Sequence, residues 1–290
     1  MSPQRRTALS TLLPGKHTLP AVTDPAEHAA YVLTRHPGST LATTAGAVLV
    51  HQGRLLRQAL ADRPEALALD GWASADLHLI SHRGHDVVLC SRLGAGAPAT
   101  ALVTEQLTAL GVPAVISLGT AAALVPELHA GEAVLCEKAL RGEGTSRHYL
   151  APGYFAHPDP HLTAALAAAL DACGTRWRRG ASWTTDALYR ESAAEAQLYA
   201  RHGILTVEME AAALFAVGRH RGLPTAAAFA VADSLVNRTP RTDSPDTTAA
   251  LEQLLTAAFD ALTNTSVSPA PPGADTVVSR HNEQREASGG

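Results

Sequence analysis

Short apolar runs that alternate with helical patterns constrain the fold of this chain more than any other feature. The sequence contains four such runs without polar alternation: residues 47–51, 86–91, 113–118 and 225–232. Runs of this length that are apolar on both faces are typical of strands in a sheet that is covered on both sides. The alternation of strands and helices along the chain therefore predicts an α/β fold with helices on both faces of the sheet.

The ends of the helices follow from capping residues. Leucine and valine keep one face apolar over residues 99–110, and Gly111 ends this pattern. A second helical pattern covers residues 210–221. The last helix begins with Ser244 as its cap and Pro245 at the first helical position, where proline is best tolerated.

The length and the local composition predict one domain between two loose ends. The chain has 290 residues, which is enough for one large domain with a substantial core. No linker or repeat interrupts residues 23–263, so we expect the domain there. Residues 1–22 lack periodicity, and residues 264–290 are rich in proline, serine, glycine and charge, so we expect both segments to be mobile.

Charge points to the class of partner. Charged residues make up 17% of the chain, the net charge is −4, and no run of lysine and arginine marks a nucleic-acid groove. We therefore expect a small-molecule ligand and no nucleic acid. No stretch approaches the roughly 18 apolar residues of a membrane span, and the first residues form a poor signal peptide, so we expect a cytoplasmic protein.

Cysteine and histidine spacing argues against disulfides and metal. The three cysteines, Cys90, Cys136 and Cys173, are far apart in apolar contexts, which predicts reduced, buried thiols. His82 and His85 have the spacing of metal ligands. Because no further set of ligands with the spacing of a metal site is evident, we interpret both as surface residues and expect no metal site.

A glycine-containing segment, residues 90–99, joins a predicted strand to a predicted helix. Gly94 and Gly96 allow a ligand to approach the backbone closely, and the helix N-terminus beyond them favours an anion. Two alternatives stay open. With Ala99 the spacing fits a dinucleotide fingerprint, but the next strand ends at residues 117–120 without the carboxylate that would hold a ribose. The segment is otherwise a tight turn without a ligand.

Acidic residues follow two of the apolar runs. Glu208 and Glu210 flank Met209 inside an apolar stretch, where a carboxylate needs a polar partner. A sugar diol would be such a partner, with Met209 as an apolar floor; the alternative is a helix start with acids at its positive end. Asp233 directly follows the run 225–232, at the sheet edge where ligands bind. It is a candidate general acid or, alternatively, a helix cap.

Several segments together resemble the nucleoside phosphorylase family, which includes uridine phosphorylases, hexameric purine nucleoside phosphorylases and related nucleosidases. Residues 207–217 (VEMEAAALFAV) and 230–234 (AVADS) are similar to its signatures. Further similarity lies at the glycine turn, the next strand end and the middle section: residues 94–98, 119–124, 140–149 and 185–189. The resemblance covers residues 45–240 and implies a three-layer α/β/α fold around a central mixed, partly closed sheet.

The resemblance also implies roles for individual residues. Phosphate would bind at Gly53, Arg57, Gly94 and Thr120. The ribose would be held by Glu208, Met209 and Glu210, together with His17, because the family borrows an N-terminal histidine from a neighbouring subunit. Asp233 would protonate or stabilise the leaving base, and the base would lie against Gly96, Thr185 and Tyr189.

By the same resemblance, phosphate attacks the anomeric carbon as a co-substrate. The products are a free base and ribose 1-phosphate, and neither a cofactor nor a metal takes part. The family relation also implies a homo-oligomer, a hexamer with shared sites.

The phosphate side departs from the family pattern. Ser117 stands where the family carries an arginine, three residues before the phosphate-side threonine. A second arginine, lent by the neighbouring subunit, would fall near residues 72–73 and is missing. Losing both weakens the binding of a dianion, because arginine pairs with phosphate in a bidentate way. Arg83, Arg92 and Arg141 are candidates to compensate.

The base side departs as well, and three functions stay open. Ser192 and Ala194 stand where uridine phosphorylases read uracil with glutamine and arginine, and Leu188 replaces a stacking aromatic residue. The first hypothesis is a phosphorylase that cleaves a purine or pyrimidine nucleoside. The second is a nucleosidase that uses water, which Ser117 favours. The third is a nucleoside-binding protein without activity.

Overall fold

The computed structural model describes residues 13–37, 41–236, 238 and 244–264 of the chain. Ten strands form one sheet: β1 (Ala47–Val50), β2 (Leu67–Ala68), β3 (Asp76–His82), β4 (His85–Ser91), β5 (Val115–Ala123), β6 (Ala133–Gly142), β7 (Phe155–Ala156), β8 (Trp177–Thr185), β9 (Ile204–Glu208) and β10 (Thr225–Ser234). The helices are α1 (Pro25–Arg35), α2 (Gly53–Ala61), α3 (Ala97–Ala109), α4 (Pro160–Ala172), α5 (Ala193–Arg201), α6 (Ala211–Arg221) and α7 (Pro245–Asn264). Short 3₁₀ turns are η1 (Lys16–Thr18), η2 (Thr145–His148) and η3 (Leu188–Arg190).

The sheet is mixed and partly closed. Strand β5 pairs in parallel with β10 along its whole length, while its first half pairs with β1 and its last residues pair antiparallel with β9. The order β5–β9–β8–β6–β10 returns to β5, which closes a ring of five strands. Strands β1, β4, β3 and β2 continue from β5 as an open extension. The predicted mixed, partly closed sheet is therefore confirmed.

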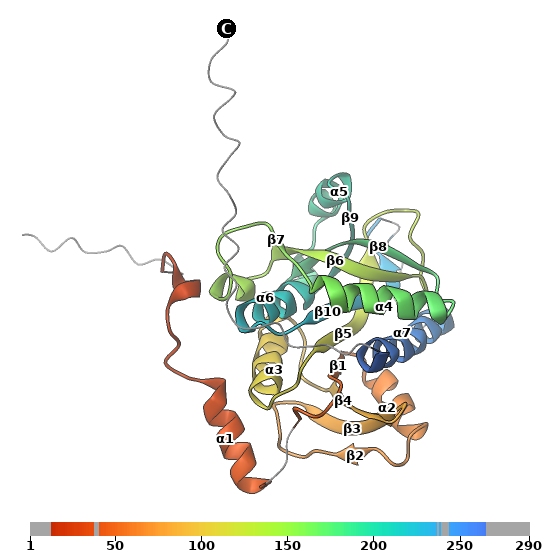
Figure 1. Ribbon diagram of the computed structural model, residues 1–290. Helices are drawn as coiled ribbons and strands as arrows, with labels where there is room; N and C mark the ends of the chain where they lie inside the picture. Colours follow the sequence, from red (N-terminus) through yellow and green to blue (C-terminus); the bar gives the residue numbers. More distant parts are fainter. Residues whose placement is uncertain (1–12, 38–40, 237, 239–243, 265–290) are drawn as a thin grey trace, which may run out of the picture.

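Helices cover both faces of the sheet (Figure 1). Helices α2, α4 and α7 pack on one face, and α1, α3 and α6 pack on the other. Alternate residues of β1 divide between the two cores: Val48 and Val50 face α7, whereas Ala47 and Leu49 face α3 and α6. Because both faces are buried, the strand needs apolar residues at every position, as its sequence shows. The three-layer α/β/α fold is confirmed.

The predicted elements correspond to observed ones, and two strands run further than predicted. Strand β5 continues to Ala123 and β10 to Ser234, because their last residues pair with each other. Helix α7 begins at Pro245, as predicted from its cap. The prediction of one domain at 23–263 stays a prediction, as does that of two mobile ends, of which residues 1–12 and 265–290 lie outside the described residues.

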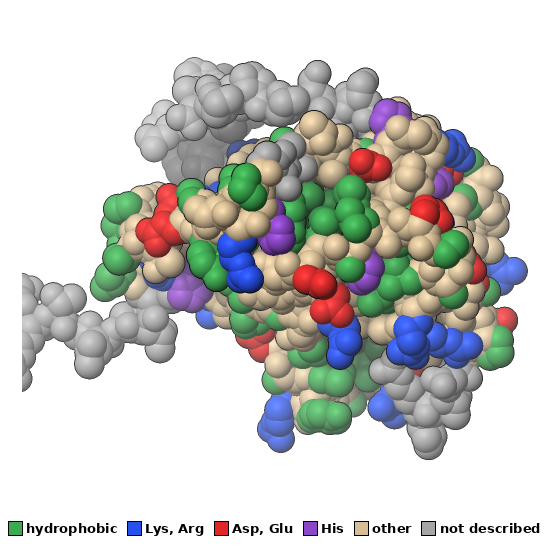
Figure 2. All heavy atoms as spheres, turned by 90° about the horizontal axis from the view of Figure 1, so that it is seen from below, with side chains coloured by type: hydrophobic (Ala, Val, Ile, Leu, Met, Phe, Trp, Pro, Cys, Tyr) green, Lys and Arg blue, Asp and Glu red, His purple; other side chains and the backbone are tan. Residues whose placement is uncertain are grey.

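The thiols agree only in part with the prediction of reduced, buried cysteines. All three cysteines are free, and Cys90 and Cys136 are buried, but Cys173 is only partly buried, so the prediction of burial is wrong for Cys173. No helix within the described ranges is long and apolar enough to cross a membrane. Figure 2 shows one face of the molecule, on which lysine and arginine side chains form small separate groups among acidic and hydrophobic ones.

Candidate active site

Four parallel strands bring their carboxyl ends to one edge of the sheet. Strands β1, β4, β5 and β10 run in the same direction, and Val50 is level with both Ser91 and Leu118. His51 and the glycine loop follow β1 and β4, and Thr120 and Asp233 lie in the second halves of β5 and β10, so the topology gathers them. Ligands of open α/β sheets bind at such an edge.

The glycine loop contacts the acidic segment that follows β9. Gly94 and Gly96 have positive φ angles of 93° and 88°, which favour glycine. The Gly96 amide donates a hydrogen bond to Glu210 Oε1 at 2.8 Å. A Cβ atom at Gly96 would lie 3.8 Å from Met209 Cε, so the loop also touches the methionine. The structure thus joins two motifs that lie 114 residues apart.

Glu208 is buried, and its own chain satisfies it. Thr184 Oγ1 donates to Oε1 at 2.5 Å, and the amides of Glu210 and Ala211 each donate to Oε2 at 2.7 Å. Burial raises the pKa of Glu208, and repulsion from Glu210 adds to this effect, whereas the hydrogen bonds oppose it. These contacts suit a residue that shapes the turn into α6, and they leave little of its carboxylate for a sugar.

Glu210 is placed differently, although only two residues away. It is the N-cap residue of α6, and its carboxylate accepts from the amides of Gly96 and Met209 at 2.8 and 3.2 Å. Its side chain keeps 14% exposure. Two backbone donors therefore fix a carboxylate that a ligand can still reach.

His51 lies beside this carboxylate, and sequence reasoning missed it. Its Nε2 is 3.0 Å from Ser117 Oγ, and its Nδ1 is 4.0 Å from Glu210 Oε1. The side chain is 10% exposed, and Nδ1 has no hydrogen-bond partner. Burial lowers the pKa of His51, against a smaller opposite effect of Glu210, so the ring is neutral at pH 7. The sequence signal that could have identified it is its position, a polar residue directly after an apolar strand.

A second polar group lies at the start of α2. Gln52, the N-cap residue of this helix, donates from Nε2 to Thr120 Oγ1 at 3.2 Å, and its Oε1 has no partner. A cavity of about 130 Å³ beside these two residues is also lined by Arg54. Arg57 Nη1 lies 3.7 Å from the Cβ position of Gly53 and is exposed, so the predicted glycine–arginine pair is close together.

Asp233 belongs to an acidic group at the end of β10. The strand is irregular between Val231 and Asp233, and Asp233 Oδ2 accepts a hydrogen bond from Arg238 Nη1 at 2.6 Å. Burial raises the pKa of nearby Glu191 to about 7, with repulsion from Asp233 adding to it and Arg238 opposing it. Glu191 gave no sequence signal, because it lies in a polar segment far from any apolar strand.

Comparison with known proteins places this arrangement in a family. The sequence profile of the Phosphorylase superfamily matches residues 54–266, which is most of the chain. The chain belongs to the phosphorylase superfamily. This membership confirms the family resemblance seen in the sequence.

Individual relatives agree with this membership. A guanosine phosphorylase from Halorubrum lacusprofundi is 33% identical over 156 residues, covering 54% of this chain and 64% of that protein. A uridine phosphorylase from Haemophilus influenzae is 29% identical over 216 residues, covering 70% and 82%. The chain thus spans less than two thirds of the guanosine phosphorylase.

Solved structures share the fold. A purine nucleoside phosphorylase from Toxoplasma gondii, solved with immucillin-H, superposes with a TM-score of 0.70 at 20% identity. A uridine phosphorylase from Vibrio fischeri superposes with a TM-score of 0.68 at 24% identity. Each match covers 77% of this chain and more than nine tenths of the other, 92% and 93%.

In this phosphorylase superfamily member, three further predicted residues lie in other elements: His17 in η1, Thr185 at the end of β8 and Tyr189 in η3. His17 is in η1 and lines a separate cavity of about 490 Å³ together with Arg141 and Arg147. Tyr189 is 96% exposed in this chain. Thr185 is buried and accepts a hydrogen bond from the Ala187 amide at 3.2 Å.

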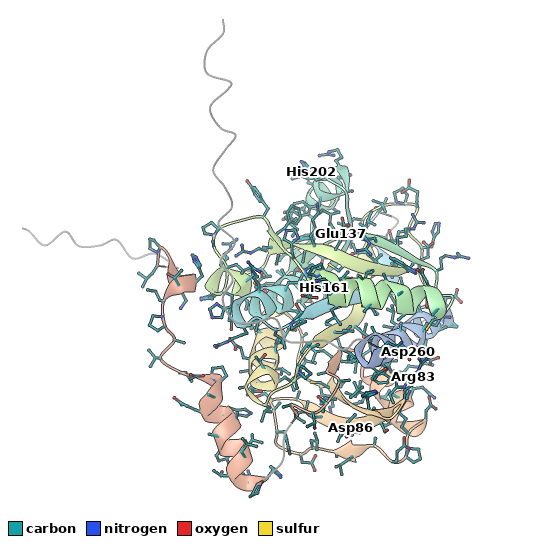
Figure 3. All side chains as sticks on the ribbon, in the orientation of Figure 1. Arg83, Asp86, Glu137, His161, His202 and Asp260 are labelled. Atoms are coloured by element: carbon teal, nitrogen blue, oxygen red, sulfur yellow. The ribbon has the colours of Figure 1, made fainter. Side chains whose placement is uncertain are left out.

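Two of the three arginines considered as compensation are engaged elsewhere. Arg83, at the turn between β3 and β4, pairs with Asp260 of α7 at 2.9 Å, and Figure 3 shows the two side by side. Arg141 donates to Ser146 Oγ at 2.8 Å and to the carbonyls of Leu150, Ala151 and Gly153. Because both arginines already have partners within the chain, these contacts argue against either as a phosphate ligand, and the hypotheses stay untested. Arg92 is 74% exposed, and its ion pair with the exposed carboxylate of Asp76 is longer, at 3.6 Å, so its guanidinium group remains accessible.

The interpretation of His82 as a surface residue is wrong. Its Nε2 lies 2.6 Å from Asp260 Oδ1, and its side chain is 17% exposed. The carboxylate that it needs lies 178 residues away, on α7. In the part of the chain that the structure describes, no group of three or more His, Cys, Asp or Glu residues could hold a metal.

Proposed function

We propose that this chain is a nucleoside phosphorylase. It cleaves the N-glycosidic bond of a purine or pyrimidine nucleoside and transfers the pentose to phosphate. The observation that carries the proposal is the hydrogen bond from the Gly96 amide to Glu210, which joins a glycine loop to a reachable carboxylate at the sheet edge. The guanosine and uridine phosphorylases among the relatives support it.

Glu210 and Met209 hold the sugar in this proposal. The Glu210 carboxylate is fixed by two amides and keeps lone pairs for the ribose hydroxyls. Met209, next to Gly96, provides an apolar floor. Glu208 acts indirectly, because its hydrogen bonds to the Glu210 and Ala211 amides set the direction of the turn.

Phosphate binds on the other side of the sugar, at Gly53, Arg57, Gly94 and Thr120. The first turn of α2 has no side-chain cap, so its free amides and its positive end attract an anion. Exposed Arg57 and Arg92 add positive charge near these groups. Bond formation from a phosphate oxygen to the anomeric carbon accompanies cleavage of the bond to the base, whose electrons leave with the base.

The leaving base is stabilised at the end of β10. Asp233 protonates or orients the base, with Glu191 and Arg238 as its charged neighbours. Gly96, Thr185 and Tyr189 line the base. Catalysis rests on positioning and fixed charges, with phosphate as co-substrate and with no protein nucleophile, cofactor or metal.

The assembly and the compartment are part of the proposal. A homo-oligomer, a hexamer by family relation, would bring His17 of one subunit to the site of another. Within its own chain His17 lines a cavity with Arg141 and Arg147 whose lining does not include Glu210. The small-molecule partners are a nucleoside and phosphate. The enzyme works in the cytoplasm.

The nucleosidase alternative rests on Ser117, which replaces a phosphate-binding arginine. One experiment separates the two. Purified protein is incubated with uridine, inosine, adenosine, guanosine and their deoxy forms, with and without phosphate, and base and sugar are followed by chromatography. Phosphate-dependent base release with a pentose 1-phosphate product supports the proposal. Release without phosphate identifies a nucleosidase, and no release from any nucleoside contradicts both.

A further inference from the structure

His51 is the buried polar residue at the sheet edge whose role the reaction described above does not explain. It directly follows β1, and its ring is enclosed on one side by Gly119, where a Cβ atom would lie 3.6 Å from His51 Cδ2. On the other side it faces Glu210. A buried imidazole nitrogen without a partner is costly in a folded protein.

The surroundings fix which ring nitrogen carries the proton. The ring is neutral, so it has one N–H group and one acceptor nitrogen. Nδ1 faces the Glu210 carboxylate, which only accepts hydrogen bonds, so the proton belongs on Nδ1. Nε2 is then the acceptor, and Ser117 Oγ, at 3.0 Å, donates its proton to it. The hydrogen bond from Ser117 thus holds the ring so that the Nδ1–H group of His51 points toward Glu210.

The gap between this donor and the carboxylate is the informative distance. Nδ1 and Oε1 are 4.0 Å apart, which is too long for a direct hydrogen bond. An oxygen placed about 2.9 Å from each atom would accept from Nδ1 and donate to Oε1, at an angle of about 90°. A hydroxyl group is able to do both without bringing a charge, whereas the negative charge of phosphate would be repelled by the Glu210 carboxylate.

We propose that His51 is a sugar-binding residue that joins a ribose hydroxyl to Glu210, with Ser117 as the positioning residue of its ring. The proposal rests on the nucleoside phosphorylase function and adds to it a histidine supplied by the same chain. It gives Ser117, which stands where an arginine was expected, a role on the sugar rather than on the phosphate. The ligand group is the 2′- or 3′-hydroxyl of the nucleoside.

Two conservative variants at position 51 test whether the Nδ1–H donor of His51, and not only the presence of a side chain of this size, is needed. His51→Asn keeps an N–H group near the position of Nδ1, whereas His51→Gln keeps its amide near Nε2 and leaves the Glu210 side without a donor. Values of kcat/KM are measured with the ribonucleoside and with its 2′-deoxy and 3′-deoxy forms. The matched control is His161→Asn, because His161 is exposed on α4 (Figure 3) and away from the sheet edge.

The expected result is a loss that depends on one hydroxyl. His51→Gln lowers kcat/KM for the ribonucleoside about tenfold but changes it less than twofold for the deoxy form that lacks the bridged hydroxyl. His51→Asn recovers most of this loss. Ser117→Ala shows the same pattern at about threefold, and His161→Asn changes nothing.

Other outcomes overturn the inference. An equal loss with all three sugars would mean that His51 serves the fold or an attacking water. If the His51 variants raise only the KM for phosphate, His51 binds phosphate and not the sugar. Nucleoside dissociation constants from calorimetry test the role of His51 separately from the phosphorylase activity. If binding shows the same dependence on one hydroxyl but no phosphorolysis occurs, His51 binds the sugar and the chain is not a phosphorylase. If no nucleoside binds at all, both proposals are contradicted.

Discussion

Replacement of Gly96 by alanine tests whether the glycine loop holds Glu210 through its backbone. Gly96 has φ 88° and ψ 174°, a conformation that is almost restricted to glycine. The atoms nearest to a new Cβ would be Met209 Cε at 3.8 Å and Pro98 Cδ at 4.0 Å, which is ordinary contact. The added methyl group therefore meets no clash, and its cost is conformational, about 1–3 kcal/mol.

The loop can relieve this strain only by rotating its backbone. Rotation turns the Gly96 amide away from Glu210 Oε1, and a hydrogen bond to a charged group contributes about 1.5–3 kcal/mol. If the carboxylate binds the sugar, kcat/KM for the nucleoside falls about 10- to 100-fold. The free energy of unfolding falls by about 1–3 kcal/mol at the same time.

Steady-state kinetics and urea unfolding measure the two effects separately. The control is Gly174→Ala, because Gly174 has φ 67° with no atom within 4 Å of its Cβ position, and it lies in the turn after α4, outside the glycine loop. We expect the control to lose about 1 kcal/mol of stability and to keep its kcat/KM. A Gly96→Ala protein that is destabilised but retains kcat/KM within twofold of wild type would refute the reasoning.

Three further variants follow from the same geometry. Asp233→Asn should lower kcat by about 10²–10⁴ with little change in nucleoside KM, as measured by initial rates, and an unchanged kcat would exclude it as the acid. Glu191 has its pKa raised to about 7, so wild type should lose stability as pH rises from about 4.5 to 7, when the unfolded carboxyl ionises more readily than the folded one. Glu191→Gln should lack this loss in urea unfolding at pH 5 and pH 8, and an identical slope would contradict the assignment. Asp260→Ala should lower the free energy of unfolding by about 2–3 kcal/mol with unchanged kcat, because it leaves His82 and Arg83 without their shared carboxylate; a change below about 0.5 kcal/mol would show that the pair is inert.

The fold was predictable because its signals are local. Strands β1, β4, β5 and β10 each correspond to a short apolar run in the sequence, and Ser244 with Pro245 marks the start of α7. The glycine loop and the Glu208–Glu210 segment were likewise predictable one at a time, since each carries its unusual residue types in a short window. Strands β6, β8 and β9 gave weaker signals, because polar residues interrupt them where the sheet closes on itself.

The pairings between distant segments were not predictable. His51 and Ser117 are 66 residues apart, and nothing near either residue shows that β1 and β5 bring them together. The partner of Arg83 lies 177 residues away, so an arginine considered as a phosphate ligand from the sequence instead binds α7. Such side-chain pairs can be predicted only once the order of the strands in the sheet is known. That order depends on the whole chain and not on any short segment.

The reverse reaction tests the central claim most directly. Purified protein is mixed with ribose 1-phosphate and a free base, and nucleoside and phosphate are followed by chromatography and phosphorus NMR. A phosphorylase must form the nucleoside and release phosphate in equal amounts, because the same transition state serves both directions. The account predicts this result for at least one purine or pyrimidine base. Release of base from nucleosides in the forward direction, with no nucleoside formed from ribose 1-phosphate and any base, would contradict it.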